Sequence, residues 1–323
     1  MTTLRSPRQS DVARKTGLSQ ATVSRVLRDD PAVLPETKAR VFEACRELGY
    51  RVSIGGRLLA EGRKAVVGLS LSERVLPTDR YTSIIHQHLV RLLQADGWSA
   101  ALLPAEGFKA SLAEIGAVIL IGVERDDGRL GTASAHGLPA VAIGHPEAEA
   151  FSVAPDDRAG GEMAARHLLS AGRRSLAVIS AARSTGDPGL ERRREGFLAV
   201  AEAAGAAARE VEIGHVPTAS LAGYKAAAAL PAQVDGVFCD TDETALGALT
   251  AIREGGGDVG AEGRISLVGF DDMPGIADAA GLTTVSQNFA QIARTALDLR
   301  QEAERGLPRR RVLTEVHLID RST

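Results

Sequence analysis

The sequence predicts a small helix-turn-helix module joined to an α/β body that is built on doubly wound parallel sheet. Three observations lead to this fold class. Residues 11–27 read DVARKTGLSQATVSRVL, a spacing that describes two short helices around a tight turn. The balance of charge changes sign near residue 64. Beyond that point, short apolar runs alternate with amphipathic helical segments, which is typical of a parallel sheet.

The first two predicted helices carry the most informative residues. Val12 and Ala13 form the apolar side of the first helix, and Gly17 lies where the chain must reverse. Ser19 is placed to cap the second helix, whose outward positions are Ser19, Gln20, Ala21, Thr22, Ser24 and Arg25. Short side chains and one Arg on the leading turns favour contact with base edges in the DNA major groove. An ordinary helical hairpin with a solvated face is the alternative.

Two further segments complete the predicted three-helix head. Residues 6–9, SPRQ, fit a capping box that starts the first helix near Pro7. A third helix is expected over Pro35–Leu48, followed by a stop at Gly49, because one face collects Val41, Phe42, Cys45 and Leu48.

The charge distribution divides the chain at the same place as the fold prediction. Residues 1–64 carry 13 Lys and Arg against 7 Asp and Glu, whereas residues 65–323 carry 25 against 34. A basic head on an acidic body favours binding to a phosphate backbone by the head alone. A solvated excess of charge without a partner is the alternative.

The run from Asp11 to Tyr50, with VSRVL, PETKARV and ELGY, resembles the headpiece of the lactose and galactose repressor family. This resemblance implies that Gln20 and Ala21 choose the operator sequence and that Arg25 occupies a third recognition position. Gln pairs with adenine, Ala touches a thymine methyl group and Arg favours guanine, so a mixed half-site is expected. Leu34 departs from the family pattern, which has a capping Ser before PET.

In the family, a short hinge helix follows the headpiece, folds on DNA and inserts a Leu into the minor groove. The resemblance places Arg57 and Leu59 at the DNA. Gly55 and Gly56 lie within this segment and each costs about 1 kcal/mol relative to Ala, which predicts a weak hinge helix. A plain flexible linker over residues 52–64 is the alternative.

The body reads as a well-packed domain without a membrane segment. Its strands are expected at residues 65–71, 98–103, 117–123, 140–144, 175–180, 236–240 and 265–270, with helices near 82–96 and 159–171. No apolar run approaches the length of a membrane span and no signal core precedes the head, so a cytoplasmic protein is expected. Cys45 and Cys239 match no disulfide or metal pair, which agrees with a reducing compartment.

The family resemblance also implies a domain plan. Residues 1–51 form the headpiece, 52–64 the hinge, and 65–323 a two-lobed, periplasmic-binding-protein-like core for effector binding and dimerisation. Lobe 1 is expected at about 65–154 and 286–309, and lobe 2 at about 155–285 and 310–323. Because this chain shows no C-terminal leucine heptads, a homodimer rather than a tetramer is expected.

Candidate effector residues come from strings that match the family, since ligands of such sheets bind beyond the carboxyl ends of the strands. GFDD supplies Asp271, LTTVSQ supplies Gln287, ERRREGF supplies Arg193, DTDETALGAL supplies Thr241 and Asp242, and PDDRAGG supplies Asp156 together with its neighbour Asp157. Carboxylates accept hydrogen bonds from adjacent hydroxyls, as on a sugar or nucleoside. A turn or cap role for Asp271, a solvated helix face for Arg193 and N-capping by Asp156 are the alternatives.

The first lobe departs most from the family pattern. Gly144 stands where the family has an Asp after a strand, and the usual Asn-Pro-Phe after the first strand is missing. Tyr81 and Phe151 are aromatic candidates without an assigned role. The chemical class of the effector, and whether the protein binds one at all, are therefore left open by the sequence.

The expected function is a transcription regulator, in particular a repressor, that binds a palindromic operator as a dimer under control of a small effector. No metal or cofactor is expected. Enzymatic activity is not expected either, because the chain lacks GxGxxG after the first strand, a phosphate-binding GxxxxGK[ST] loop and a nucleophile elbow. A free-standing sugar receptor would need an export signal and no basic head. A regulator whose core serves only dimerisation or partner binding is the remaining alternative.

Overall fold

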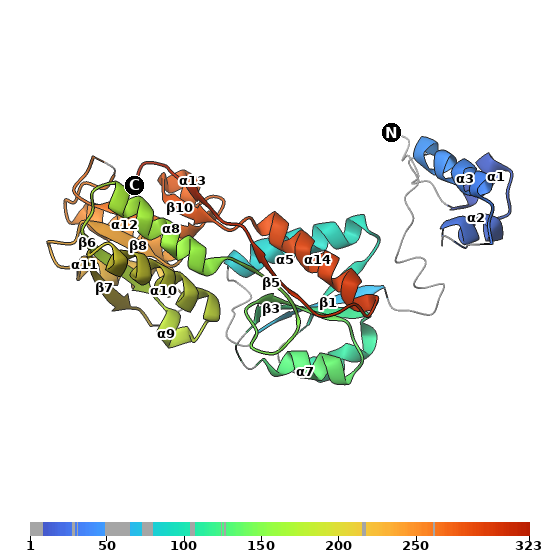
Figure 1. The fold of residues 1–323 in the computed structure, drawn as a ribbon, viewed down its shortest axis with the longest axis horizontal. Coiled ribbons are helices and arrows are strands. Elements are labelled where there is room, and N and C mark those ends of the chain that lie inside the picture. The colour runs from blue at the N-terminus through green and yellow to red at the C-terminus, as the bar shows by residue number, and fades with distance from the viewer. Residues whose placement is uncertain are drawn as a thin grey trace. The chain divides into compact units, whose positions relative to one another are not determined.

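A computed structural model describes residues 9–27, 30, 32–48, 65–72, 80–103, 107–123, 125, 127–214, 218–260 and 262–323 (Figure 1). The chain divides near Ala65 into two compact units, a head and a body. Residues 6–8 of the predicted capping box at 6–9 lie outside the described residues, as does the hinge at residues 52–64 with Arg57 and Leu59; Gln9 begins α1.

The head is a three-helix unit, as the spacing predicts. It comprises α1 (Gln9–Thr16), α2 (Gln20–Leu27) and α3 (Pro35–Leu48). Its core contains Val12, Ala13, Val23, Val26, Val41, Ala44 and Cys45. The prediction that Phe42 lies on the inner face of α3 is wrong, since Phe42 is 45% exposed. Helical periodicity puts Ala44 and Cys45, rather than Phe42, on the side of Val41.

The first lobe of the body is built on a six-stranded sheet in the order β11-β5-β4-β3-β1-β2, with its strand pairs parallel. Its strands are β1 (Val66–Leu71), β2 (Ser99–Leu103), β3 (Ala117–Val123), β4 (Ala140–Gly144), β5 (Phe151–Pro155) and β11 (Arg311–Thr314). Helices α5 (Arg80–Ala95) and α14 (Phe289–Glu304) pack together on one face. On the other face lie α6 (Phe108–Ser111), η1 (Leu112–Glu114) and α7 (Gly128–Ala135), as Figure 1 shows.

The second lobe repeats this topology in the order β12-β10-β9-β8-β6-β7. Its strands are β6 (Ser175–Ser180), β7 (Ala207–Glu212), β8 (Gly236–Cys239), β9 (Ser266–Asp271), β10 (Thr283–Ser286) and β12 (His317–Ile319). One face is covered by α8 (Asp157–Ser170) and α10 (Pro188–Ala203), and the other by α11 (Ala219–Ala228) and α12 (Asp242–Glu254). The short helices α9 (Ala182–Thr185) and α13 (Ala277–Ala280) follow β6 and β9.

The chain passes between the lobes three times. It leaves the first sheet after β5 and enters α8, returns between β10 and α14, and crosses again between β11 and β12. Because each crossing follows the end of a strand, residues next to the crossings lie beside the opening between the two sheets. Asp157, Gln287 and Asn288 are such residues.

Two glycines bring α8 and α10 into backbone contact. A Cβ at Gly161 would lie 1.9 Å from the Arg193 carbonyl oxygen, and one at Gly196 would lie 2.2 Å from that of Arg158. Only residues without a side chain fit here. This packing sets the first turn of α8, which carries Asp157, beside the middle of α10, which carries Arg193.

The predicted strands and the two predicted helices of the body are all present. Five described strands are not among the expected ones, namely β5, β7, β10, β11 and β12. FSVAP of β5 is short and ends in Pro, AAREVE of β7 is polar and mostly exposed, and the other three have only three or four residues each. β12 pairs antiparallel with β10, so the second sheet is mixed at its edge. β11 pairs with β5 and therefore belongs to the first lobe, although its residues fall beyond the expected end of that lobe at residue 309.

Candidate functional site

The outward face of α2 is the first candidate site. Ser19 caps this helix as predicted: its Oγ accepts a hydrogen bond from the Thr22 backbone N at 3.0 Å. Gln20 and Ala21 are exposed beside it, whereas Val23 and Val26 are fully buried. The second helix therefore presents its leading turn to solvent while its apolar face holds it on the head.

Arg25 has a partner within the head. Its Nε lies 2.8 Å from Oδ2 of Asp30, and Oδ1 of Asp30 accepts a hydrogen bond from the backbone N of Ala32 at 2.8 Å. Asp30 is thus held by the turn after α2 and orients the guanidinium of Arg25. The sequence predicts that Arg25 lies at the surface but does not predict this partner, because the spacing of apolar residues carries no information about polar contacts.

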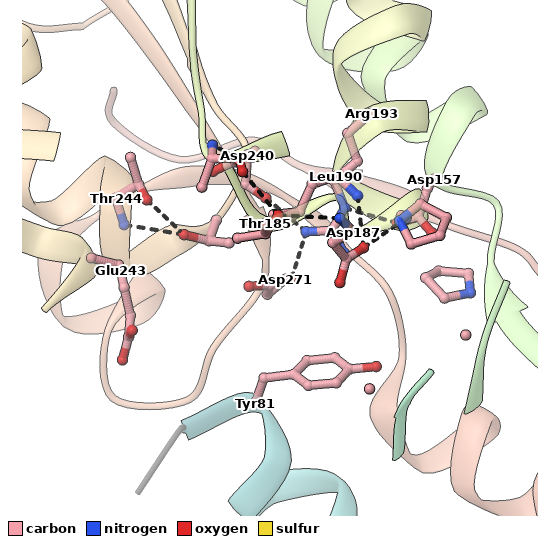
Figure 2. Close-up of a pocket in the computed structure, with 18 of the residues that line it drawn as sticks. Tyr81, Asp157, Thr185, Asp187, Leu190, Arg193, Asp240, Glu243, Thr244 and Asp271 are labelled. Carbon is pink, nitrogen blue, oxygen red and sulfur yellow. Dashed lines mark hydrogen bonds and ion pairs between the residues drawn. The ribbon is translucent and has the colours of Figure 1, made fainter. Parts of the chain in front are cut away.

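The second candidate site is a cavity of about 330 Å³ between the lobes of the body (Figure 2). This volume lies at the lower end of the range for small-molecule sites. The first lobe contributes Tyr81, Thr82, Gly122, Val123, Ile143, Gly144 and His145 to its lining. The second lobe contributes most of the charged groups, namely Asp157, Asp187, Arg193, Asp240, Glu243 and Asp271. Both lobes therefore bound the same space.

Arg193 is the centre of the charged network. Its Nε donates to Oδ1 of Asp157 at 2.7 Å, and its Nη1 donates to Oδ1 of Asp271 at 3.1 Å and to the carbonyl of Asp240 at 2.7 Å. Its guanidinium carbon lies 3.6 Å from the centre of the Phe270 ring, a cation–π contact. Figure 2 shows Arg193 directed from α10 toward Asp157 and Asp271. Its side chain is therefore held in one orientation, and only 6% of the residue is exposed.

Asp271 occupies the end of β9 with an unusual backbone conformation. Its φ is +117°, a value that costs energy for any residue with a side chain. Its Oδ1 accepts hydrogen bonds from Arg193 and from Nε2 of Gln287, the latter at 2.6 Å. A strained residue that is buried beside a cavity is characteristic of a binding site.

Burial and the arginine act in opposite directions on the acid groups. Burial alone raises the pKa of Asp157, but the Arg193 guanidinium and His145 lower it further, so the net pKa lies below its usual range. Burial raises the pKa of Asp240 to about 6. Burial also raises the pKa of Asp271 well above its usual range, which Arg193 offsets only in part. The pKa values of the carboxyl groups in this cavity are therefore shifted in opposite directions.

Among the described residues, three side-chain contacts join the two lobes. At the cavity, His145 Nε2 lies 2.7 Å from Oδ2 of Asp157, and both residues are buried. Arg125 forms an ion pair with Glu191. Nη1 of Arg80 donates to the carbonyl of Pro274 at 3.4 Å.

Within the part of the chain that the structure describes, no group of three or more His, Cys, Asp or Glu side chains is arranged to hold a metal ion. No helix among the described residues is long and apolar enough to cross a bilayer.

Comparison with known proteins extends these observations. Residues 10–53 match bacterial regulatory proteins of the lacI family, and residues 165–323 match a periplasmic binding protein-like domain. The HTH-type transcriptional regulator MalR of Streptomyces coelicolor is 30% identical over 93% of this chain and 91% of its own. The chain belongs to the lacI family. It is a DNA-binding transcriptional regulator.

Solved structures agree with this membership. The structure of the transcriptional regulator CelR in complex with cellobiose superposes with a TM-score of 0.68 at 25% identity and covers 98% of this chain and 99% of its own. The Lac repressor dimer bound to operator superposes with a TM-score of 0.69 at 22% identity, over 99% of each chain, which supports the shared fold. The expected fold class and family are therefore confirmed.

The structure of this lacI-family regulator separates the effector candidates into three groups. Arg193, Thr241 and Asp271 line the cavity. Gln287 and Asp242 lie behind the lining: Gln287 holds Asp271, and Asp242 accepts hydrogen bonds from Thr284 Oγ1 and the Met273 backbone N. Asp156 is the N-cap of α8 and accepts from the Ala159 backbone N at 3.1 Å, so the alternative considered for it describes its position.

Of the pair Asp156 and Asp157, the second enters the cavity, because the first turn of α8 points its side chain toward Arg193. Several other lining residues of the regulator are absent from those candidates. Asp240 and His145 follow the carboxyl ends of β8 and β4, which is a signal that a search of every strand end would detect. Tyr81 extends from the start of α5 below the charged network in Figure 2.

Proposed function

We propose that this regulator is a repressor that binds a palindromic operator as a homodimer, and that a small, hydroxyl-rich effector in the interlobe cavity controls its affinity for DNA. The observation that carries the proposal is the buried Arg193, held by Asp157 and Asp271 inside a cavity that both lobes line. A core that served only for dimerisation would have no need of such a network, since burying charged groups costs free energy of desolvation even when they are paired.

The DNA-binding part of the proposal is supported by the exposed turn of α2. Gln20 and Ala21 are free to contact base edges, with Gln suited to adenine and Ala to a thymine methyl group. Arg14 and Lys15 at the end of α1 are exposed and suited to phosphate contact. Two heads related by a dimer axis would read two half-sites, which is the reason for proposing a palindrome.

The effector part is supported by the chemistry of the lining. Carboxylates accept hydrogen bonds from vicinal hydroxyls, and Thr241 and Thr244 add groups that both donate and accept. The relative CelR is described in complex with cellobiose, which favours a sugar-like class for this chain also.

Control of DNA binding would follow from the position of the cavity. An effector that contacts His145 or Tyr81 on one lobe and Asp271 on the other stabilises one arrangement of the lobes. It shifts the DNA-competent population only by its differential affinity for the two arrangements.

Two measurements test the proposal. Operator sites selected from random duplexes are titrated with the regulator and its variants by fluorescence anisotropy. Gln20→Ala is expected to change base preference at one position of each half-site, whereas Arg14→Ala weakens all duplexes alike. Identical effects of the two substitutions would contradict the recognition role of α2.

For the effector, thermal unfolding of the full chain is followed against a panel of sugars and nucleosides. At least one compound is expected to raise the midpoint and alter operator affinity, and Asp271→Ala should remove both responses while operator binding persists. If no compound raises the unfolding midpoint and operator binding is normal, the result favours the alternative in which the regulator acts without an effector.

A further inference from the structure

The interlobe cavity has a large excess of acidic groups among its described lining residues. Five carboxyl groups line it, those of Asp157, Asp187, Asp240, Glu243 and Asp271. Arg193 is the single Lys or Arg in the described lining, and His145 is the single histidine. With all five carboxyl groups ionised, the formal charge of the lining is −4 with a neutral His145 and −3 with a protonated one. Burial raises the pKa of Asp187, Asp240 and Asp271, so this negative charge develops fully only as those groups ionise.

The two basic groups are already engaged with the protein itself. Arg193 donates through Nε to Asp157 and through Nη1 to Asp271 and the Asp240 carbonyl, while its face packs on Phe270. His145 contacts the same Asp157 at 2.7 Å. Nη2 of Arg193 is left to donate to a ligand, but the positive charge of the guanidinium is already shared by Asp157 and Asp271. An anionic ligand would therefore be repelled by the remaining carboxylates of the lining.

Asp271 offers an unused acceptor toward this space. Both hydrogen bonds that its side chain accepts from described residues end on Oδ1, from Arg193 and Gln287, and none ends on Oδ2. The residue is only 2% exposed and lines the cavity. Burial raises the pKa of Asp271, and a positive charge beside Oδ2 would favour its ionised form. A cationic ligand would therefore gain a charge-assisted hydrogen bond in a place shielded from water.

Asp240 adds to the same preference. Its Oδ2 accepts a hydrogen bond from the Ala181 backbone N at 2.8 Å, but Arg193 contacts its carbonyl and not its carboxylate. A neutral sugar would donate hydroxyl hydrogen bonds to these oxygens but would leave the net negative charge of the cavity unchanged.

Building on the proposed function, we propose that the cavity selects a hydroxyl-rich effector that carries a protonated amine, such as an amino sugar, with the ammonium group beside Asp271. The hydroxyl groups are bound by the remaining carboxylates and threonines. Phosphorylated and carboxylated sugars are excluded by charge, although they carry the same hydroxyls.

Isothermal titration of the full chain at about pH 7 with matched sugars tests this specificity. The probes are glucose, galactose and mannose, their 2-amino-2-deoxy counterparts, the N-acetyl derivatives of those amines, and glucose 6-phosphate. At least one amino sugar is expected to bind ten-fold or more tightly than both its neutral parent and its N-acetyl derivative, and glucose 6-phosphate is expected not to bind. The N-acetyl derivative is decisive, because it keeps the nitrogen but loses the charge.

Asp271→Asn tests the position of the amine. It removes one negative charge and keeps the shape, so the preference for the amine over its neutral parent should fall to about three-fold or less. Glu243→Gln, at another lining carboxyl group, provides a second variant if the first does not fold, as judged by thermal unfolding, and should also reduce the preference. Asp320→Asn, an exposed position away from the lining, makes the same chemical change and should leave the preference intact.

Equal or tighter binding of a neutral or N-acetylated sugar would overturn the inference and would leave the proposed function standing. Retention of the full preference by Asp271→Asn would overturn the assigned position of the ammonium. Binding by none of the probes would overturn the amino-sugar class, and the effector function would then be judged by the wider panel and operator assay described above.

Discussion

Nε2 of His145 lies 2.7 Å from Oδ2 of Asp157, and the two side chains come from different lobes. His145 follows β4 of the first sheet, whereas Asp157 begins α8 of the second lobe. Asp157 also accepts from Arg193, so one buried carboxylate joins the lobe interface to the cavity network. Both of its oxygens are hydrogen-bonded, which compensates the loss of hydration on burial.

Replacing His145 by Ala should destabilise the body. The substitution leaves one oxygen of the buried Asp157 without its partner, which costs about 1–3 kcal/mol. Urea unfolding of the two proteins measures the difference. His136→Ala is the control, because His136 is exposed at the end of α7 and its contact is to a backbone carbonyl. Equal losses for the two variants would contradict a special role for the interlobe pair.

Gly161→Ala should separate the helices that bring Asp157 to Arg193. The new Cβ would lie 1.9 Å from the Arg193 carbonyl oxygen, so the helices must shift, and the free energy of unfolding should fall by about 1–3 kcal/mol. Gly131→Ala in α7 is the matched control, since no atom lies within 4 Å of the added group. It should be neutral or stabilise by up to about 1 kcal/mol. Chemical denaturation compares both, and a tolerated Gly161→Ala would disprove the tight packing.

Asp242 should make stability depend on pH. Burial raises the pKa of Asp242 to about 7, while its hydrogen bonds from Thr284 and Met273 act in the opposite direction. The unfolded chain releases this proton near pH 4, so between about pH 4 and 7 the folded state binds more protons. Stability contributed by this group is therefore full at low pH and lost as pH rises through 7, by at most about 1.4 kcal/mol per pH unit.

Asp242→Asn should remove that component. The amide is neutral at every pH, can accept from the Met273 backbone N and can donate to Thr284 Oγ1. Unfolding free energies measured from pH 5 to 8 should show a variant-minus-parent difference that grows toward pH 7 and then levels off. The exposed Asp320→Asn should show a flat difference. A flat profile for Asp242→Asn as well would mean that its pKa is not raised in the folded chain.

Asp30→Ala should alter operator preference through Arg25. Without the 2.8 Å ion pair, the guanidinium is released from its fixed orientation, and discrimination at the base it reads should change by about 1–3 kcal/mol. Asp11→Ala removes an equal charge from α1, beside Arg14 rather than Arg25. Both variants should bind all duplexes somewhat more tightly, but only Asp30→Ala should change the base preference. Anisotropy titrations against single-position operator variants distinguish the two results.

Much of the fold could be predicted because its signals are local. The spacing of Val12, Val23, Val26 and Val41 predicts the helices of the head, and each becomes part of its core. Buried parallel strands such as AVILIGV also read as continuous apolar runs. The strands that lacked this signal were FSVAP, which is short, AAREVE, which lies at an exposed edge, and the three strands of three or four residues near the C-terminus, β10, β11 and β12.

Local spacing thus predicts the head and the alternation of the body, and family resemblance points to Arg193 and Asp271. The folded chain is needed to see that Asp157 rather than Asp156 enters the cavity, and that His145 meets it from the other lobe. Helix and strand periodicity depends on neighbouring residues, whereas the cavity joins side chains that are 12 to 78 positions apart. Their meeting depends on three chain crossings and on the close approach of α8 and α10, which no local pattern records.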